Sequence, residues 1–225
     1  GVEKDLFNQE AFNKLEELKP QYFKETNPIK KQEYKNQIDV LIKEISKGHT
    51  QFDFEVYFSE VFHQKGGFDI VIANPPYSGI LKNISKIINV FNYYDSRKNS
   101  ASFFIERASK LTNEKGIVAY IIPKSLTYVE GWQPTRNFVL DKNVLLSIVD
   151  VSKAFENVLL EQVIIVFKTI KREADYSFFT FEGWGRQIRQ IGEWAASLCN
   201  SLGIIPIHTD KQKLTILDKI ERNSV

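Results

Sequence analysis

The chain has 225 residues, of which 43% are hydrophobic and 13% aromatic, enough apolar material for a sizeable core. Its 30 basic and 28 acidic residues nearly balance, so net charge alone does not indicate a nucleic-acid partner. The single cysteine, Cys199, excludes an intramolecular disulfide and a cysteine-rich zinc site, and favours a reducing compartment. The sequence shows no signal-peptide pattern and no apolar run long enough to span a bilayer. It starts at Gly1 and lacks methionine, so we expect a piece of a longer protein.

Residues 1–50 are predicted to form a helical hairpin. Apolar residues recur there at helical spacing, in two stripes: Phe12, Leu15, Leu18 and Tyr22, then Tyr34, Ile38, Leu41, Ile42 and Ile45. Asn27-Pro28 breaks the pattern between the helices, and Gly48 ends the second one. Lysines and glutamates fill the outer faces, which is typical of a solvated hairpin. A partner-binding surface is the alternative.

A strand is expected at residues 52–58, where apolar side chains alternate with Asp53, Glu55 and Tyr57. After a turn at Gly66-Gly67, a strand is expected at 69–73, where Ile70 to Ala73 form a short apolar run typical of a parallel strand covered on both faces.

The central feature of the chain is Asn74-Pro75-Pro76-Tyr77, which follows this run directly. The two prolines end the strand, because neither can donate an N–H. What remains is an amide oxygen, backbone carbonyls and an aromatic ring, a combination that suits a planar group bearing an NH2. Such a cluster could be an ordinary turn, since Asn and Pro are common turn residues. Its place at the carboxyl end of a strand, where open α/β sheets bind ligands, favours a functional site.

The rest of the chain alternates strands and helices, after a connection at 78–100 that is either a mobile functional loop or an ordinary helical link. Strands are expected at 116–123, 145–151, 162–168 and 176–181. Helices are expected near 102–111 and 134–140, and a short one at 213–221. This order predicts an α/β fold with a mostly parallel sheet and an antiparallel last strand.

Together these stretches resemble the second half of a class I, Rossmann-like methyltransferase fold. They are most similar to the adenine-specific DNA methyltransferases of restriction–modification systems, including enzymes that fuse cleavage and methylation in one chain. Residues 68–77 look like motif IV of that family, residues 102–108 like motif V, and Phe155 like the aromatic residue of motif VIII. The likeness covers about residues 50–170. It divides the chain into a hairpin (1–50), the catalytic half (51–170) and a connection (171–225) towards a recognition domain outside the chain.

The resemblance implies a reaction and its residues. S-adenosylmethionine would donate a methyl group to the exocyclic amine of an adenine flipped out of double-stranded DNA. Asn74 and the Pro75 carbonyl would accept the amine hydrogens, with Pro76 completing the motif, and Tyr77 and Phe155 would stack on the base. Phe104 would pack on the cofactor, and Asp53 is a candidate for the acidic residue near it. The resemblance implies no metal and no membrane, and it places the protein in a bacterial cytoplasm.

One family feature is missing before Asn74, namely a strand ending in a glycine-rich cofactor loop. Gly183-Trp184-Gly185 mimics such a loop, but too few residues follow it to complete that half of the fold. We therefore expect the cofactor loop upstream of Gly1.

Three alternative functions stay open: methylation of RNA bases, methylation of a glutamine amide in release factors, and a non-catalytic DNA-recognition or scaffold role. A nuclease role has no support, because the segment around Asp53 lacks the lysine that a metal-dependent nuclease core requires.

Overall fold

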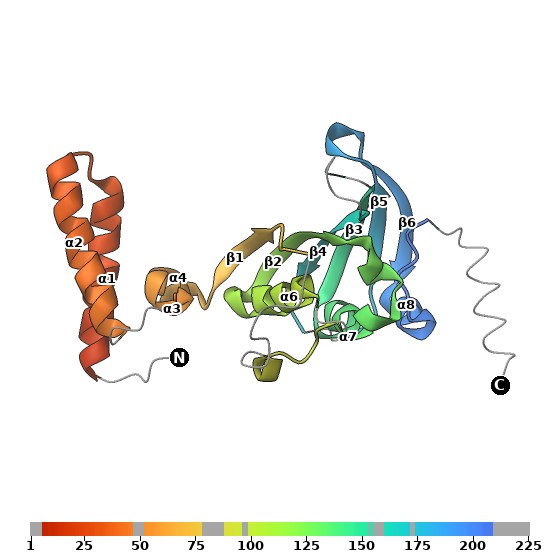
Figure 1. The fold of residues 1–225 in the computed structure, drawn as a ribbon, viewed down its shortest axis with the longest axis horizontal. Coiled ribbons are helices and arrows are strands. Elements are labelled where there is room, and N and C mark those ends of the chain that lie inside the picture. The colour runs from red at the N-terminus through yellow and green to blue at the C-terminus, as the bar shows by residue number, and fades with distance from the viewer. Residues whose placement is uncertain are drawn as a thin grey trace, which may run out of the picture. The chain divides into compact units, whose positions relative to one another are not determined.

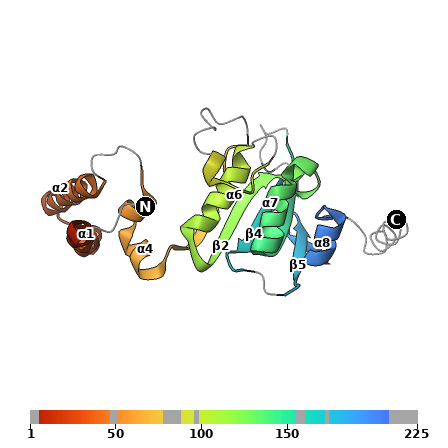
Figure 2. The same ribbon diagram turned by 90° about the horizontal axis from the view of Figure 1, so that it is seen from below.

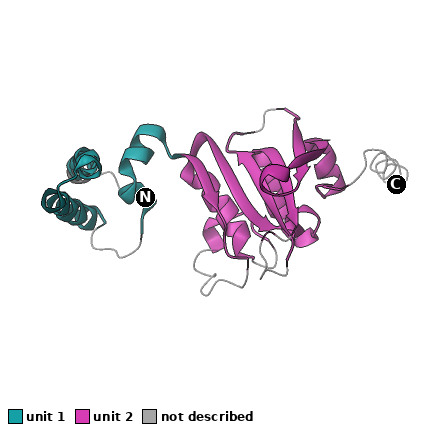
Figure 3. Ribbon diagram, turned by 90° about the horizontal axis from the view of Figure 1, so that it is seen from above, with its two compact units in different colours: residues 1–68 teal, residues 69–225 magenta. Residues whose placement is uncertain are grey.

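The computed structural model describes residues 6–46, 52–77, 88–95, 99–152, 154, 160–171 and 174–208. The chain divides into two compact units, residues 1–68 and 69–225 (Figure 3). Among the described residues, no helix combines the length and apolar character that crossing a membrane requires.

The first unit begins with the predicted helical hairpin, α1 (Leu6–Lys24) and α2 (Pro28–Ile45) (Figure 1). The Asn27 side chain caps α2 by accepting hydrogen bonds from the N–H groups of Ile29 and Lys30, and Pro28 occupies the first turn, where its missing N–H costs nothing. The apolar stripes of both helices meet in a small core: Ala11, Leu15, Leu18, Ile38, Leu41 and Ile45.

Two short helices follow, α3 (Phe54–Tyr57) and α4 (Ser59–Lys65), so the predicted strand at 52–58 is wrong. Asp53 starts α3 as its N-cap, accepting a hydrogen bond from the N–H of Glu55 at 2.9 Å. The helical turn points Val56 into the hairpin core, where it is 1% exposed. The same sequence alternates at period two, but burial of Val56 and capping by Asp53 favour the helix.

Lys19 of α1 joins the hairpin to these short helices. Its side chain is buried, and its ammonium group donates to the Tyr57 carbonyl (2.7 Å), the Ser59 hydroxyl (3.3 Å) and the Glu60 carboxylate (2.7 Å). Every proton of this buried cation therefore has an acceptor, which offsets its desolvation.

The second unit is built on a six-stranded sheet with the order β1-β2-β4-β3-β5-β6. β4 is antiparallel to β2 and to β3, β3 is parallel to β5, and β6 is antiparallel to β5. The strands are β1 (Phe68–Ala73), β2 (Thr112–Pro123), β3 (Val144–Ser152), β4 (Gln162–Lys168), β5 (Ser177–Glu182) and β6 (Arg189–Ala195). The structure confirms the α/β class and the four predicted strands β1 to β4. It also confirms that β4, the last of these four, is antiparallel to its neighbours. The sheet as a whole is mixed, and β6 was not predicted.

β1 runs in the same direction as β2. Asp69, at the start of β1, accepts a hydrogen bond from the Asn113 amide at the start of β2, 2.8 Å away. Beyond the end of β1, Tyr77 donates to the carbonyl of Ile121 near the end of β2. The two residues of each pair are 44 positions apart in the sequence, and this constant offset is that of two strands running in the same direction. The strands β1, β2, β3 and β5 therefore all end at one side of the sheet, which we call the carboxyl edge.

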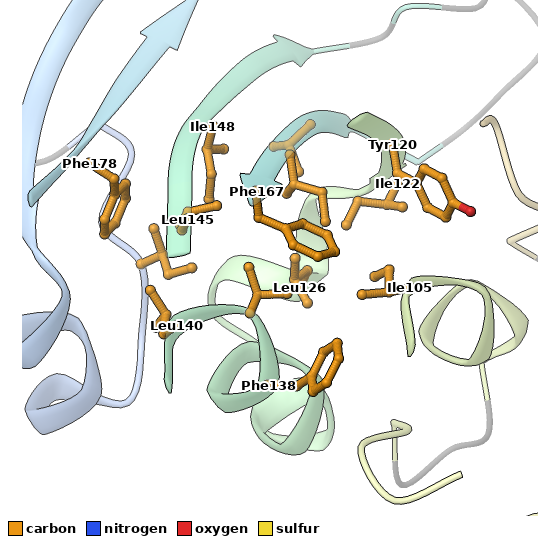
Figure 4. Packing of buried hydrophobic residues seen from close by; sticks show 14 of the residues in the cluster. Ile105, Tyr120, Ile122, Leu126, Phe138, Leu140, Leu145, Ile148, Phe167 and Phe178 are labelled. Carbon is orange, nitrogen blue, oxygen red and sulfur yellow. The ribbon is translucent and has the colours of Figure 1, made fainter. Parts of the chain in front are cut away.

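Helices cover one face of this sheet: α6 (Ser100–Leu111), α7 (Gln133–Asn137) with the wider turn η4 (Phe138–Lys142), and α8 (Ala196–Leu202) (Figure 2). The core lies between these helices and the strands (Figure 4). The helices α6 and α7 confirm the positions predicted for them. The predicted helix at 213–221 lies outside the described residues.

β1 is an edge strand, and it is covered on one face only. Val71 and Ala73 pack against the core, whereas Ile70 and Ile72 are 57% and 74% exposed. The expectation of a strand covered on both faces is therefore wrong for β1. The reason is that the helices lie on a single side of the sheet.

Candidate active site

The candidate site lies at the carboxyl edge, where Asn74, Pro75, Pro76 and Tyr77 follow β1 directly. The Asn74 side chain is exposed, and it makes no hydrogen bond within the described part of the chain. Both its amide oxygen and its amide N–H groups are therefore free to meet a ligand.

The two proline carbonyls differ in their partners. The Ser100 hydroxyl, in the first turn of α6, donates to the Pro76 carbonyl at 2.5 Å. Among the described residues, no hydrogen bond engages the carbonyl of Pro75. The proline carbonyl beside Asn74 that has no described donor is thus that of Pro75, a buried residue, and it is the one predicted to accept a hydrogen of the substrate amine.

Tyr77 is held by both of its ends. Its ring packs against the main core, and its hydroxyl donates to the Ile121 carbonyl at 3.1 Å. Burial raises the pKa of this phenol above its usual 10.0, so it stays a protonated donor through neutral pH. The ring therefore has a fixed place beside the motif.

Ser100 is the site residue that the sequence reasoning missed. It follows Asn99, whose side chain caps α6 by accepting from the N–H of Ala101. A capping residue just before an apolar helix was a signal for where that helix begins, but the contact of its first turn with the motif is a tertiary one.

Phe104 lies four residues after Ser100, and so on the same side of α6. It is 39% exposed, while its neighbours Phe103 and Ile105 are buried. The helix therefore directs a half-exposed ring towards the side on which Ser100 meets Pro76. The predicted cofactor contact of Phe104 stays a prediction.

Two predicted site residues lie in other parts of the chain. Asp53 belongs to the first unit, where it caps α3, and its cofactor role stays a prediction. Phe155 lies outside the described residues, and its stacking role also stays a prediction.

A buried carboxylate, Asp150, connects several loops at the carboxyl edge. It is 2% exposed and accepts hydrogen bonds from the Lys124 ammonium (2.8 Å), the Ser152 N–H (2.8 Å) and the His208 imidazole. Burial opposes its ionisation, but these donors outweigh burial and hold the pKa of Asp150 below 3.8. Lys124 also pairs with Glu161 at 3.0 Å, and despite burial the two carboxylates raise the pKa of the lysine.

Gln162 fixes both sides of the connection between β3 and β4. Its side chain is fully buried, its carbonyl oxygen accepts from the Ala154 N–H at 2.9 Å, and its amide donates to the Leu160 carbonyl. This connection is the one that carries Phe155. Across the described ranges, no group of three or more His, Cys, Asp or Glu side chains is placed to hold a metal ion.

The loop at Gly183 to Gly185 joins β5 to the antiparallel strand β6. Glycine-rich loops that bind nucleotide-like cofactors lead from a strand into a helix. The position of this loop in a hairpin therefore gives no support to reading it as a cofactor loop.

Comparison with known proteins defines the class of this chain. Residues 5–156 match the family model described as Eco57I restriction-modification methylase. The match covers more than half of the chain, and the chain therefore belongs to this family of restriction–modification methylases. A comparison with curated protein sequences returns no match.

Solved structures are similar to this chain at a low level. The methyltransferase subunit of a type I restriction–modification system from Streptococcus thermophilus is 15% identical, with a TM-score of 0.45, over 69% of this chain and 36% of that one. A modification subunit of a type I restriction enzyme from Vibrio vulnificus is 12% identical, with a TM-score of 0.43, over 67% and 34%. A class I S-adenosylmethionine-dependent methyltransferase from Listeria monocytogenes is 10% identical, with a TM-score of 0.42, over 61% and 42%. The chain thus spans less than half the length of each of these proteins.

Proposed function

We propose that the protein carrying this chain transfers a methyl group from S-adenosylmethionine to the exocyclic amine of adenine in double-stranded DNA, as part of a restriction–modification enzyme. The observation that carries the proposal is the arrangement of acceptors after β1. Within the part of the chain that the structure describes, the Asn74 amide and the Pro75 carbonyl have no hydrogen-bond partner, whereas the Pro76 carbonyl accepts a hydrogen bond from Ser100. Membership of the restriction–modification methylase family supports the DNA substrate.

The acceptors have a chemical task. The lone pair of adenine's amine is delocalised into the ring, so the free base is a poor nucleophile. Acceptors on both amine hydrogens favour a pyramidal nitrogen whose lone pair points out of the ring plane. The Asn74 side-chain oxygen and the Pro75 carbonyl offer these two positions. S-adenosylmethionine, when bound, supplies the sulfonium methyl group that this nitrogen attacks.

Tyr77 can offset part of the cost of base flipping. The target base must leave the duplex at a cost of a few kcal/mol. Stacking of a base on an aromatic ring contributes ~1–3 kcal/mol. The Tyr77 ring is held by its core contacts and by the bond to Ile121, so little of that gain is lost in ordering the ring.

The described residues fit only part of a cofactor site. Phe104 presents a half-exposed ring on the side of α6 that meets the motif, and it would pack on the cofactor's adenine. The acceptors of Asn74 and Pro75 lie on the methyl-acceptor side. Residues that would hold the cofactor's ribose and methionine are not identified in the described ranges.

The experiment uses the full-length protein with tritiated cofactor and four substrates: duplex DNA, tRNA, rRNA and a release factor. We expect label on duplex DNA, recovered as N6-methyladenine after hydrolysis. Asn74→Ala should lower turnover by orders of magnitude and leave the melting temperature unchanged, because the side chain is exposed. Asn137→Ala removes another exposed amide, at the end of α7, and is the matched control. Label on RNA or on glutamine, or near-normal methylation by Asn74→Ala, would refute the proposal.

A further inference from the structure

The hairpin loop between β5 and β6 exposes a tryptophan. The chain has three tryptophans, and Trp132 and Trp194 are each 3% exposed, whereas Trp184 is 55% exposed. Ile188, on the other side of the same loop, is 45% exposed. We call residues 183–189 the hairpin loop. These two are among the large apolar side chains that the structure leaves exposed.

The backbone of the hairpin loop is held in one conformation. Gly183 has a φ of +115°, and a Cβ at this position would lie 2.2 Å from the Gln187 carbonyl oxygen, so only glycine fits. The Gly183 N–H donates to the Asp150 carbonyl at 3.0 Å, and the Gln187 N–H donates to the Trp184 carbonyl at 3.1 Å. The indole of Trp184 is thus presented on a framework that is already ordered, which lowers the entropic cost of binding.

Two arginines follow Trp184 closely in the sequence, and one acidic residue, Glu182, precedes it. Residues 183–192 contain Arg186 and Arg189 and no acidic residue. Arg189 pairs with Glu182 but stays 76% exposed, whereas Arg186 forms no ion pair with any residue that the structure describes. Gln187 and Gln190, also exposed, add amide donors and acceptors. Arginines and amides complement the phosphates and groove edges of a duplex, and an indole beside them can pack on its sugars, so this loop suits a duplex better than an acidic or purely apolar partner surface.

The hairpin loop lies at the carboxyl edge, the same edge as Asn74 and Tyr77, and Figure 1 shows it beyond the end of β5. Four strand spacings separate β1 from β5 in the sheet order. At ~4.8 Å each they amount to about 19 Å. With 3.4 Å per base pair, this corresponds to about 6 base pairs of a duplex lying along the edge.

We propose that the hairpin loop is a contact surface for duplex DNA, with Arg186 on a backbone phosphate and Trp184 packed against sugar and bases about 6 base pairs from the methylated adenine. The proposal rests on the proposed function for its substrate. It adds a binding surface outside the Asn74 site.

The experiment follows binding and does not depend on methyl transfer. Acrylamide quenching of the chain's tryptophan fluorescence reports mainly on Trp184, because the other two indoles are buried. We expect a 30-base-pair duplex to shield this fluorescence. Arg186→Ala should weaken duplex binding about 5- to 10-fold and reduce the salt slope by about 1. Trp184→Ala should weaken it about 10-fold, and Trp184→Phe should recover most of the loss.

Lys142→Ala is the control, since it removes one exposed positive charge on η4, among the helices that cover the sheet. Circular dichroism checks that each variant is folded. Unshielded fluorescence at saturating duplex, no duplex binding by the unmodified chain, or equal losses for Arg186→Ala and Lys142→Ala would each overturn the inference. So would unchanged DNA affinity in the hairpin variants together with a changed oligomeric state, which would mark the loop as a protein contact. None of these outcomes alters the test of methyl transfer with Asn74→Ala.

Discussion

The Tyr77 hydroxyl donates a hydrogen bond to the Ile121 carbonyl, 3.1 Å away, and so ties the turn after β1 to the end of β2. A base that stacks on this ring requires only its π-face. The hydroxyl has a separate role, because it fixes where that face lies. The two roles can be separated by substitution.

Tyr77→Phe in the full-length protein is expected to retain most methylation activity, within about tenfold, because the ring remains. It should lower the free energy of unfolding by about 1 kcal/mol through loss of the bond to Ile121. Tyr77→Ala should lose the stacking contribution of ~1–3 kcal/mol, a fall of about 5- to 150-fold in kcat/KM.

Steady-state methylation kinetics and urea unfolding test these two expectations together. Tyr128→Phe is the control, because this tyrosine is 59% exposed on the same edge region and should change neither quantity. Equal activity losses for Tyr77→Phe and Tyr77→Ala would show that the hydroxyl, and not the ring face, is what catalysis requires.

Asp150 makes the stability of the second unit depend on pH. Its folded pKa lies below the ordinary 3.8, so its ionic contacts contribute fully above about pH 3.8 and are lost as the pH falls through the folded pKa. Asp150→Asn should therefore cost on the order of 2–4 kcal/mol at pH 7, where Lys124 and His208 lose their buried partner. The difference from wild type should narrow at pH 3.

Chemical unfolding at pH 7 and at pH 3 measures this difference. Glu161 is the second partner of Lys124, and its side chain is 54% exposed. Glu161→Gln should therefore lower the free energy of unfolding by less than about 1 kcal/mol. A constant cost for Asp150→Asn at both pH values would mean that the ionised carboxylate contributes no stability of its own.

Cys199 is expected to be unreactive in the native chain. Its thiol is 1% exposed, and burial, with a smaller effect of nearby Asp175, raises its pKa to about 12. Only the thiolate attacks thiol reagents, so the native protein should not label at pH 8 within minutes. One thiol per chain should label above the urea midpoint. Rapid labelling of the native chain would contradict the buried position of Cys199 in the core.

The isolated chain is expected to bind S-adenosylmethionine poorly and to leave DNA unmethylated. No glycine-rich loop of the family's kind leads from a strand to a helix before Asn74 in the described residues, and the Gly183 loop is part of a hairpin. Loss of two or three polar contacts of ~0.5–1.5 kcal/mol each would weaken binding ~10-fold to several hundred-fold. Calorimetric titration of the chain, with ATP as the control ligand, measures this affinity. A micromolar dissociation constant would show that the site is complete within these residues.

The sequence by itself determined the elements whose patterns are strong. Runs of branched apolar residues located β1, β2, β3 and β4, and two apolar stripes located the helical hairpin, because burial of a continuous face depends only on local spacing. The prolines after Ala73 fixed where β1 ends. The position of the motif at the end of its strand therefore follows from the sequence alone.

Other features were decided by contacts between residues far apart in the sequence. At 52–58 the alternating pattern predicted a strand, but packing of Val56 into the hairpin core selected a helix. β6 was missed because its sequence is mostly polar, with a glycine at 192, and it becomes a strand by pairing with β5.

Only the tertiary structure decided which acceptors of the motif are free. Ser100, 24 residues after Pro76, occupies one proline carbonyl, and Ile121, 44 residues after Tyr77, takes the phenol hydrogen. Hydrogen bonds of this kind depend on how the strand and helix ends meet in space, and no local pattern in the sequence encodes that meeting. The sequence could therefore place the Asn-Pro-Pro-Tyr motif on its strand, while the packing of α6 and β2 around it determined that Asn74 is exposed and that, of the two proline carbonyls, the one of Pro76 has a hydrogen-bond donor among the described residues.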